Sequence, residues 1–249
     1  VSGQTCSRKV DFNVLSVLSG IAQSASKFAG DIRLLSHLKE FDEPFEAGQI
    51  GSSAMAYKRN PMRSERIASL ARYVMADLMN PAMTAATQWL ERTLDDSANR
   101  RIALPEAFLA TDGLLSLYIN VISGGTVYPN MMKRHLKEEL PFMATENILM
   151  YCVQKGGNRQ ELHEAIRRHS VATTKQIKLL GADNDLLDRI LADPVFHLTR
   201  EELNTILDVG NGGFTGCAGE QTETYLTEVV RPLLAANAGV QPVKVDIEV

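Results

Sequence analysis

The sequence predicts an all-α protein, a bundle of long helices followed by a smaller helical domain. Three observations indicate this class. Apolar residues recur at helical spacing over long stretches of the first half, and glycines and prolines divide the second half into short helical segments. A hydrophobic fraction of 45% over 249 residues also supplies enough apolar surface for one large core or two smaller ones.

The first half is expected to hold three long helices. Apolar positions of the first alternate steps of four and three, as in a bundle seam: Val14, Leu18, Ile21, Ala25, Phe28, Ile32 and Leu35. A long connection over 42–60 leads to a second helical stretch from Pro61 to about Leu94, broken or kinked at Pro81. After a polar interruption over 94–101, a third helix runs from about Ile102 to Ile122, with Pro105 in its first turn.

Gly124 and Gly125 then end the long helices, and shorter helices are expected near 130–138, 142–154, 158–178, 184–192, 199–207 and 219–236. We therefore expect a bundle domain over 1–127, containing a functional loop at 46–61, and a helical C-terminal domain over 128–249. The tail 243–249 alternates apolar and polar residues, which indicates either a lone strand or a loose terminus.

Composition excludes several classes. A formal charge of −4 argues against a dominant nucleic-acid role, since phosphate binding usually requires a basic surface. Three widely spaced cysteines, Cys6, Cys152 and Cys217, lack zinc or disulfide spacing and favour the reducing cytoplasm. No membrane span or secretory leader is expected. Because the chain begins at Val1 without a methionine, we expect it to be a fragment.

The richest segment for chemistry runs from Gly51 to Pro61 and reads Gly-Ser-Ser-Ala-Met-Ala-Tyr-Lys-Arg-Asn-Pro. Its glycine gives backbone freedom, and its serines and lysine supply a hydroxyl and a charge. Asn60 before Pro61 predicts an N-cap followed by a first-turn proline, so the loop should lead into a helix N-terminus that attracts anions.

This spacing resembles the signature of the fumarase/aspartase superfamily, commonly Gly-Ser-Ser-x-Met-Pro-x-Lys-x-Asn-Pro. The following Arg63-Ser64-Glu65-Arg66 resembles its adenylosuccinate lyase branch. Ala56 stands where the signature usually has proline, which puts the rigidity of the loop in doubt more than its identity. The resemblance extends from about Gln4 to Phe214 and corresponds to the central and C-terminal parts of a longer enzyme.

The resemblance implies that Ser52 is the catalytic base and that Lys58 stabilises its alkoxide and the charged intermediate. Ser53, Met55 and Asn60 complete the implied substrate contacts of the loop, with Met55 packing rather than reacting. From Gly-Ser-Ser alone, ordinary loop serines and a solvated lysine would be the better interpretation. Among the nearby arginines, the resemblance favours Arg66 over Arg63 as a ligand.

A second group of implied contacts surrounds Asp95-Asp96, similar to the substrate-binding segment of adenylosuccinate lyases. Ser97 and Arg101 would hold the nucleotide phosphate, and Arg92 another part of the substrate. Without the signature, an ordinary charge pattern at a helix end would be the preferred interpretation. Gln4 also resembles a substrate contact, although a capping role competes with it.

The five histidines have no metal-ligand spacing, and we expect structural or surface roles for all of them. The resemblance implies a general-acid histidine in a segment N-terminal to this chain, so the chain alone is expected to be inactive. It implies no metal and no organic cofactor.

The implied activity is a carbon-nitrogen (amidine) lyase of purine biosynthesis. It would release fumarate from adenylosuccinate, giving AMP, and from the succinylated aminoimidazole carboxamide ribotide. Family members are cytoplasmic homotetramers with active sites shared between subunits. Two alternatives stay open: another superfamily lyase, such as an argininosuccinate type, and a noncatalytic helical scaffold.

Overall fold

The computed structural model describes residues 6–45, 55, 57–90, 94–211 and 213–240. Within these ranges the chain is almost wholly helical, which confirms the predicted all-α class. The chain divides into two compact units, with the break after Met131. We propose that these units correspond to the two expected domains, 1–127 and 128–249.

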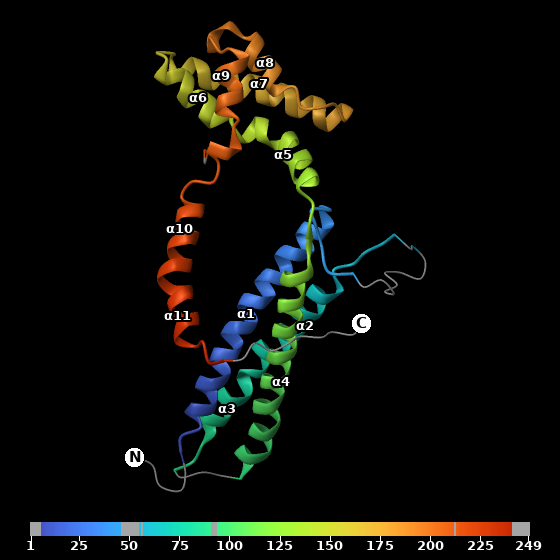
Figure 1. Cartoon of the computed structure of the whole chain (residues 1–249), viewed down its shortest axis with the longest axis vertical. Helices are drawn as coiled ribbons and strands as arrows, with labels where there is room; N and C mark the ends of the chain where they lie inside the picture. Colours follow the sequence, from blue (N-terminus) through green and yellow to red (C-terminus); the bar gives the residue numbers. More distant parts are fainter. Residues whose placement is uncertain (1–5, 46–54, 56, 91–93, 212, 241–249) are drawn as a thin grey trace. The chain divides into compact units, whose positions relative to one another are not determined.

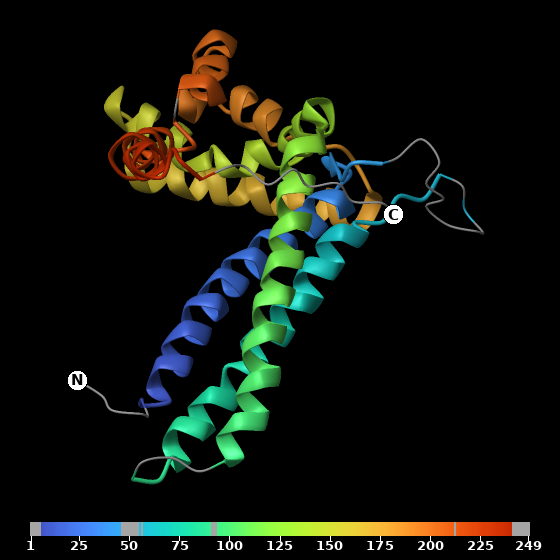
Figure 2. The ribbon, with the colours of Figure 1, turned by 60° about the horizontal axis from the view of Figure 1, so that its bottom comes forward.

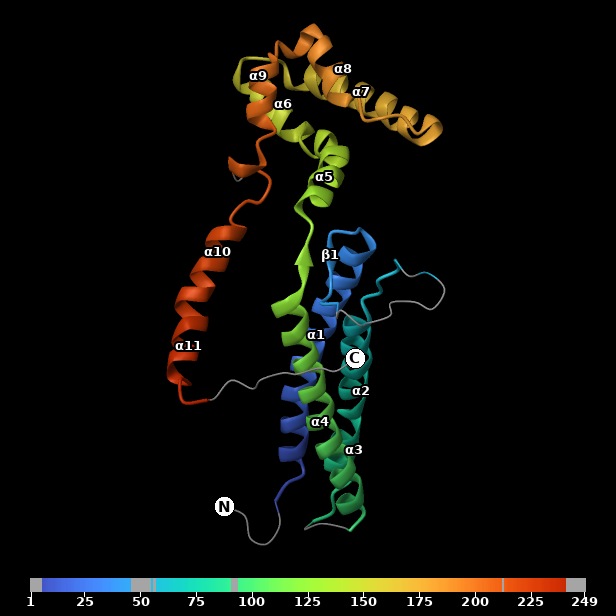
Figure 3. The ribbon, with the colours of Figure 1, turned by 45° about the vertical axis from the view of Figure 1, so that its right-hand side comes forward.

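The first unit contains a bundle of long helices, which lie side by side in Figures 1 and 3. Its helices are α1 (Lys9–His37), α2 (Met62–Asp77), α3 (Met79–Thr87) and α4 (Asp95–Gly124). Two short antiparallel strands, β1 (Phe41–Asp42) and β2 (Thr126–Val127), close one end of the bundle, with Phe41 opposite Val127. This strand pair has no evident sequence signal, because each strand has only two residues.

Small side chains form much of the bundle core. Of the predicted α1 seam, Leu18, Ala25 and Ile32 are buried, and the other four residues are partly buried against the same core. Alanines from all three long helices are also buried there: Ala22, Ala29, Ala68, Ala71, Ala103 and Ala107. Because alanine projects little from a helix, the backbones are able to approach closely. At the strand end, Gly125 meets the Phe41 ring, which a Cβ would approach to 2.0 Å.

Of two helix boundaries predicted from the sequence, one agrees closely with the structure and one does not. The break near Pro81 occurs at Leu78, between α2 and α3. Proline lacks an N–H and its ring clashes with the carbonyl four residues earlier, which here is that of Asp77, the last residue of α2. The expected interruption over 94–101 is wrong, because α4 already begins at Asp95 and carries Pro105 in its interior.

Within the described residues, one helix, α4, is long and apolar enough to cross a membrane, judged by length and composition only. The sequence-based expectation of no such stretch overlooked it. Its apolar window is 28% buried in the chain, where Ala107, Leu114 and Val121 pack into the bundle core. Much of the remaining surface is apolar and exposed, including Ile102, Leu109 and Ile122.

The second unit is made of shorter helices, close to the ranges predicted from the sequence. They are α5 (Pro129–Met143), α6 (Thr145–Gln154), α7 (Arg159–Leu180), α8 (Leu186–Ala192), α9 (Arg200–Ile206), α10 (Ala218–Tyr225) and α11 (Arg231–Ala236). Two short 3₁₀ helices, η1 (Pro194–Phe196) and η2 (Val209–Asn211), and one π-helical segment, η3 (Leu226–Val230), complete the unit. Ile148, Leu162, Ile190, Phe196 and Leu203 form the centre of its core. The tail 243–249 lies outside the described residues.

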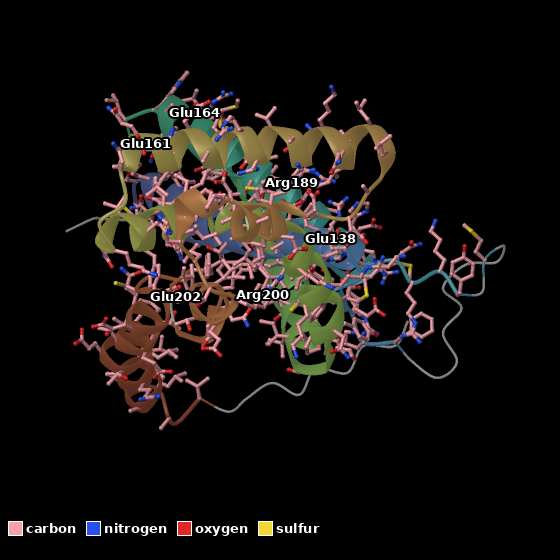
Figure 4. All side chains as sticks on the ribbon, turned by 90° about the horizontal axis from the view of Figure 1, so that it is seen from above. Glu138, Glu161, Glu164, Arg189, Arg200 and Glu202 are labelled. Atoms are coloured by element: carbon pink, nitrogen blue, oxygen red, sulfur yellow. The ribbon has the colours of Figure 1, made fainter. Side chains whose placement is uncertain are left out.

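Glu202, labelled in Figure 4, lies on α9 and joins this helix to the C-terminal end of α6. Its carboxylate accepts hydrogen bonds from Lys155 Nζ at 2.7 Å, Tyr151 OH at 3.0 Å and the Thr199 N–H at 2.8 Å. The bond from Lys155 is the largest cause that lowers the pKa of Glu202 to about 2. The carboxylate is therefore ionised over the whole neutral and mildly acidic range.

Replacing Glu202 by glutamine is expected to lower the melting temperature of the chain at neutral pH but not near pH 2. A carboxyl group with a depressed folded-state pKa stabilises the fold above its unfolded pKa of about 4.3 and loses this effect as the pH falls through the folded value. Thermal unfolding followed by circular dichroism across this range measures the difference, with Glu139→Gln on α5 as an exposed control. If Glu202→Gln lowers the melting temperature equally at neutral pH and near pH 2, the ionised Glu202 carboxylate does not stabilise the fold.

Candidate functional site

The signature segment leads directly into α2. Lys58 donates its backbone N–H to the Met55 carbonyl at 2.9 Å, and Met62 donates to the Asn60 carbonyl at 2.8 Å. The side chains of Met55, Lys58 and Asn60 are exposed, and Lys58 forms no ion pair with any described residue. Ser52, Ser53 and Ala56 lie outside the described residues, so the roles predicted for them stay predictions.

The N-terminus of α2 is capped by Glu43 rather than by Asn60. Glu43 Oε2 accepts the Arg63 N–H at 2.9 Å, and Oε1 accepts the Ser64 N–H at 2.7 Å. The capping position itself is Pro61, whose ring has no acceptor. The prediction of Asn60 as N-cap is therefore wrong. The predicted anion site at this helix end is also wrong, because the Glu43 carboxylate already occupies it.

The arginines near the signature have different surroundings. Arg63 is only 3% exposed and donates from Nη1 to the Pro44 carbonyl at 2.8 Å, whereas Arg66 is exposed. Although only three residues apart on α2, the two arginines therefore face different surroundings, and the preference for Arg66 as a ligand fits its exposure. Arg59 lies 3.7 Å from Asp42 and stacks over the Phe45 ring at 4.6 Å. The Arg66 guanidinium therefore forms no ion pair with a described carboxylate.

A groove of about 880 Å³ runs along α1 and reaches the signature segment. Its lining includes Gly30, Arg33 and His37 of α1 together with Asn60 and Glu65. Asn60 also lines a separate small void beside Glu43, and there Arg66 lies in the lining with it. The structure therefore brings Asn60 and Arg66 together near the C-terminal end of α1.

The second predicted group lies at the start of α4. Ser97 is in the first turn and Arg101 one turn later, so both project from one face of the helix. Arg101 is exposed and has no ion pair with a described residue. Gln4 and Arg92, the other members of this group, lie outside the described residues.

Two ion pairs, one buried and one partly buried, hold this end of α4 against the start of α1. Arg8 Nε lies 2.6 Å from Asp96, and Arg100 Nε lies 2.9 Å from Asp11. The hydrogen bond from Arg100 lowers the pKa of Asp11, so this pair stays charged at neutral pH. The sequence shows these residues as a helix-end charge pattern, but their partners lie roughly ninety residues away. Both acids are thereby neutralised, and the positive charge of Arg101, which no described carboxylate pairs, is available to an anion.

The signature group (Lys58, Asn60 and Arg66) and the Ser97 group (Ser97 and Arg101) lie at opposite ends of the bundle. The Ser97 group is near the start of α1, because Asp11 of α1 pairs with the neighbouring Arg100. The signature group is near the other end, because Asn60 lines the same groove as His37, the last residue of α1. At about 1.5 Å per residue, α1 separates these ends by roughly 40 Å. Figure 2 shows the start of α1 close to the start of α4, and the other end of α1 close to the start of α2. One chain therefore does not bring the two groups together.

The chain resembles known lyases in sequence and in fold. Residues 4–76 match the family model described as "Lyase". The fold is similar to 3-carboxy-cis,cis-muconate lactonizing enzyme from Pseudomonas putida (24% identity, TM-score 0.74, 88% of this chain and 47% of that one) and to fumarate lyase from Mesorhizobium sp. BNC1 (20% identity, TM-score 0.71, 89% and 47%). The fold is that of the fumarase/aspartase superfamily of lyases.

Residues 141–225 match the model "Adenylosuccinate lyase C-terminus". The chain is 52% identical to adenylosuccinate lyase of Schizosaccharomyces pombe (100% of this chain, 52% of that protein) and 52% identical to that of Saccharomyces cerevisiae (94% and 48%). It belongs to the adenylosuccinate lyase family. It spans about half the length of these curated relatives.

Proposed function

We propose that this chain forms the central and C-terminal part of an adenylosuccinate lyase. The complete enzyme would be a carbon-nitrogen lyase that releases fumarate from adenylosuccinate, giving AMP, and from the succinylated aminoimidazole carboxamide ribotide. It would act in the cytoplasm as a soluble enzyme. The observation that carries the proposal is a set of three exposed cationic side chains that form no ion pair with a described residue. Lys58 and Arg66 lie at the signature segment and Arg101 lies near the start of α4, the two places where the family's substrate contacts are expected.

The proposed reaction is a β-elimination. Ser52, as an alkoxide, takes the proton from the carbon next to a substrate carboxylate, and the electron pair of that C–H bond forms the fumarate double bond. The C–N bond breaks, and its electrons go to the nitrogen, which a general acid protonates. Lys58 and Asn60 hold the carboxylate and stabilise the charge that develops on it. We propose that a histidine from polypeptide outside this chain is the acid.

We propose that the enzyme is a homotetramer in which each active site combines both ends of the bundle from different subunits. The separation of roughly 40 Å along α1 supports this, because a nucleotide is far too short to reach both groups of one chain. The exposed apolar side chains of α4 also support it, since such a surface is typical of a subunit interface. Ser97 and Arg101 of one subunit would then hold the phosphate while Lys58 and Asn60 of another act on the succinyl group.

The proposal is tested with the 249-residue chain and with a chimera. In the chimera, this chain replaces the matching 52% of the Schizosaccharomyces pombe relative, which supplies the rest of the enzyme. The chimera is expected to release fumarate from adenylosuccinate, followed by its ultraviolet absorbance, and the isolated chain is expected to release none. A folded tetrameric chimera without activity, or fumarate release by the isolated chain, would contradict the proposal.

A further inference from the structure

Glu43 lies at the base of the signature segment and takes the capping role that the sequence assigns to Asn60. We propose that Glu43 is a positioning residue for the reaction: by capping α2, it leaves the Asn60 amide free for substrate and holds the Lys58–Asn60 segment in place. This inference rests on the proposed function, because it assigns Glu43 to the same active site.

Three hydrogen bonds join residues 43–44, before the signature segment, to residues 63–64, after it. Two run from the Arg63 and Ser64 N–H groups to the Glu43 carboxylate, and the third runs from Arg63 Nη1 to the Pro44 carbonyl. Arg63 and Ser64 are both buried, so water competes little with these bonds. Residues 43–44 are thereby tied to residues 63–64, on either side of Lys58 and Asn60.

The carboxylate also completes the hydrogen bonding of the first turn. Met62 donates to the Asn60 carbonyl at 2.8 Å and Glu65 donates to the Pro61 carbonyl at 3.0 Å, which leaves the Arg63 and Ser64 N–H groups for Glu43. A charged acceptor at a helix N-terminus is favoured both by its hydrogen bonds and by the helix dipole. No N–H of this turn is left that requires the Asn60 side chain.

Asn60 is consequently available for another partner. Its side chain is exposed, lines the groove along α1 and makes no hydrogen bond to any described residue. Asparagine is among the preferred N-cap residues. Without the Glu43 carboxylate, the Asn60 amide is expected to turn towards the Arg63 N–H, which lies three residues on and is within reach of an N-cap side chain, and to leave the groove.

The test compares Glu43→Ala with Asn158→Ala in the chimera. Asn158 caps α7 in the second unit by accepting from the Gln160 and Glu161 N–H groups, so its loss is a matched structural change away from the signature segment. Each substitution is expected to lower the melting temperature by about 2–4 °C. Only Glu43→Ala should also lower kcat, by about 10- to 100-fold with a smaller change in KM, because misplaced catalytic groups cost mainly transition-state stabilisation.

A double variant shows whether Glu43 acts through Asn60. If it does, Glu43→Ala combined with Asn60→Ala should lose little more activity than Asn60→Ala alone, since coupled residues are not additive. Glu43→Gln, which keeps one acceptor oxygen, should fall between the parent chimera and Glu43→Ala. Additive losses, or kinetics of Glu43→Ala equal to those of Asn158→Ala, would overturn the inference while the proposed function stands. An inactive parent chimera would instead refute the proposed function.

Discussion

Replacing Lys58 by methionine in the chimera is expected to lower kcat for fumarate release by about 10²- to 10³-fold, the usual cost of removing one preorganised stabilising group. Methionine keeps the unbranched side chain but removes the charge. Lys58 is exposed and forms no ion pair with a described residue, so its charge is available to a serine alkoxide or a substrate carboxylate. Lys58→Arg, which keeps the charge, should lose less activity than Lys58→Met.

The measurement is steady-state fumarate release together with thermal unfolding of each variant. Because Lys58 lies on the surface, the melting temperature should change little, as for most surface substitutions. Lys178→Met, an exposed lysine on α7, is the control and should leave both quantities unchanged. Full turnover in Lys58→Met would mean that the signature lysine does not stabilise charge in this enzyme.

The fold could be predicted where local patterns determine it. The spacing along α1 predicted a bundle seam, and Pro81 predicted a break that occurs where its ring would oppose the Asp77 carbonyl. The start of α4 could not be predicted this way, because Asp96 and Arg100 appear as solvated polar residues. They are accommodated by Arg8 and Asp11, partners that no local pattern reveals.

In the candidate site, too, some features could be predicted from the sequence and others could not. The signature motif predicted Lys58, Asn60 and Arg66, and the structure leaves all three exposed beside the start of α2. The cap of α2 was assigned to the wrong residue, because local rules consider Asn60 and not a carboxylate 17 positions earlier in the sequence. The distance between the two predicted groups was also not predictable, since it depends on which helix ends lie together.

Because roughly 40 Å separates the two ends of the bundle within one chain, we propose that they meet in one active site only between different subunits. Two inactive variants of the chimera with defects at opposite ends should therefore restore each other. Lys58→Met lacks the signature charge, and Arg101→Ala lacks the proposed phosphate contact. In a mixed tetramer, some sites take Lys58 from one parent and Arg101 from the other.

The most direct test is to unfold and refold these two variants together in equal amounts and to measure fumarate release. Each residue is intact in half of the subunits, so activity is expected to rise from nearly none to about a quarter of that of the unsubstituted chimera. Native mass spectrometry confirms that mixed tetramers have formed. If mixed tetramers form and the activity stays at the level of the separate variants, the two ends do not share a site between subunits, and the account is wrong.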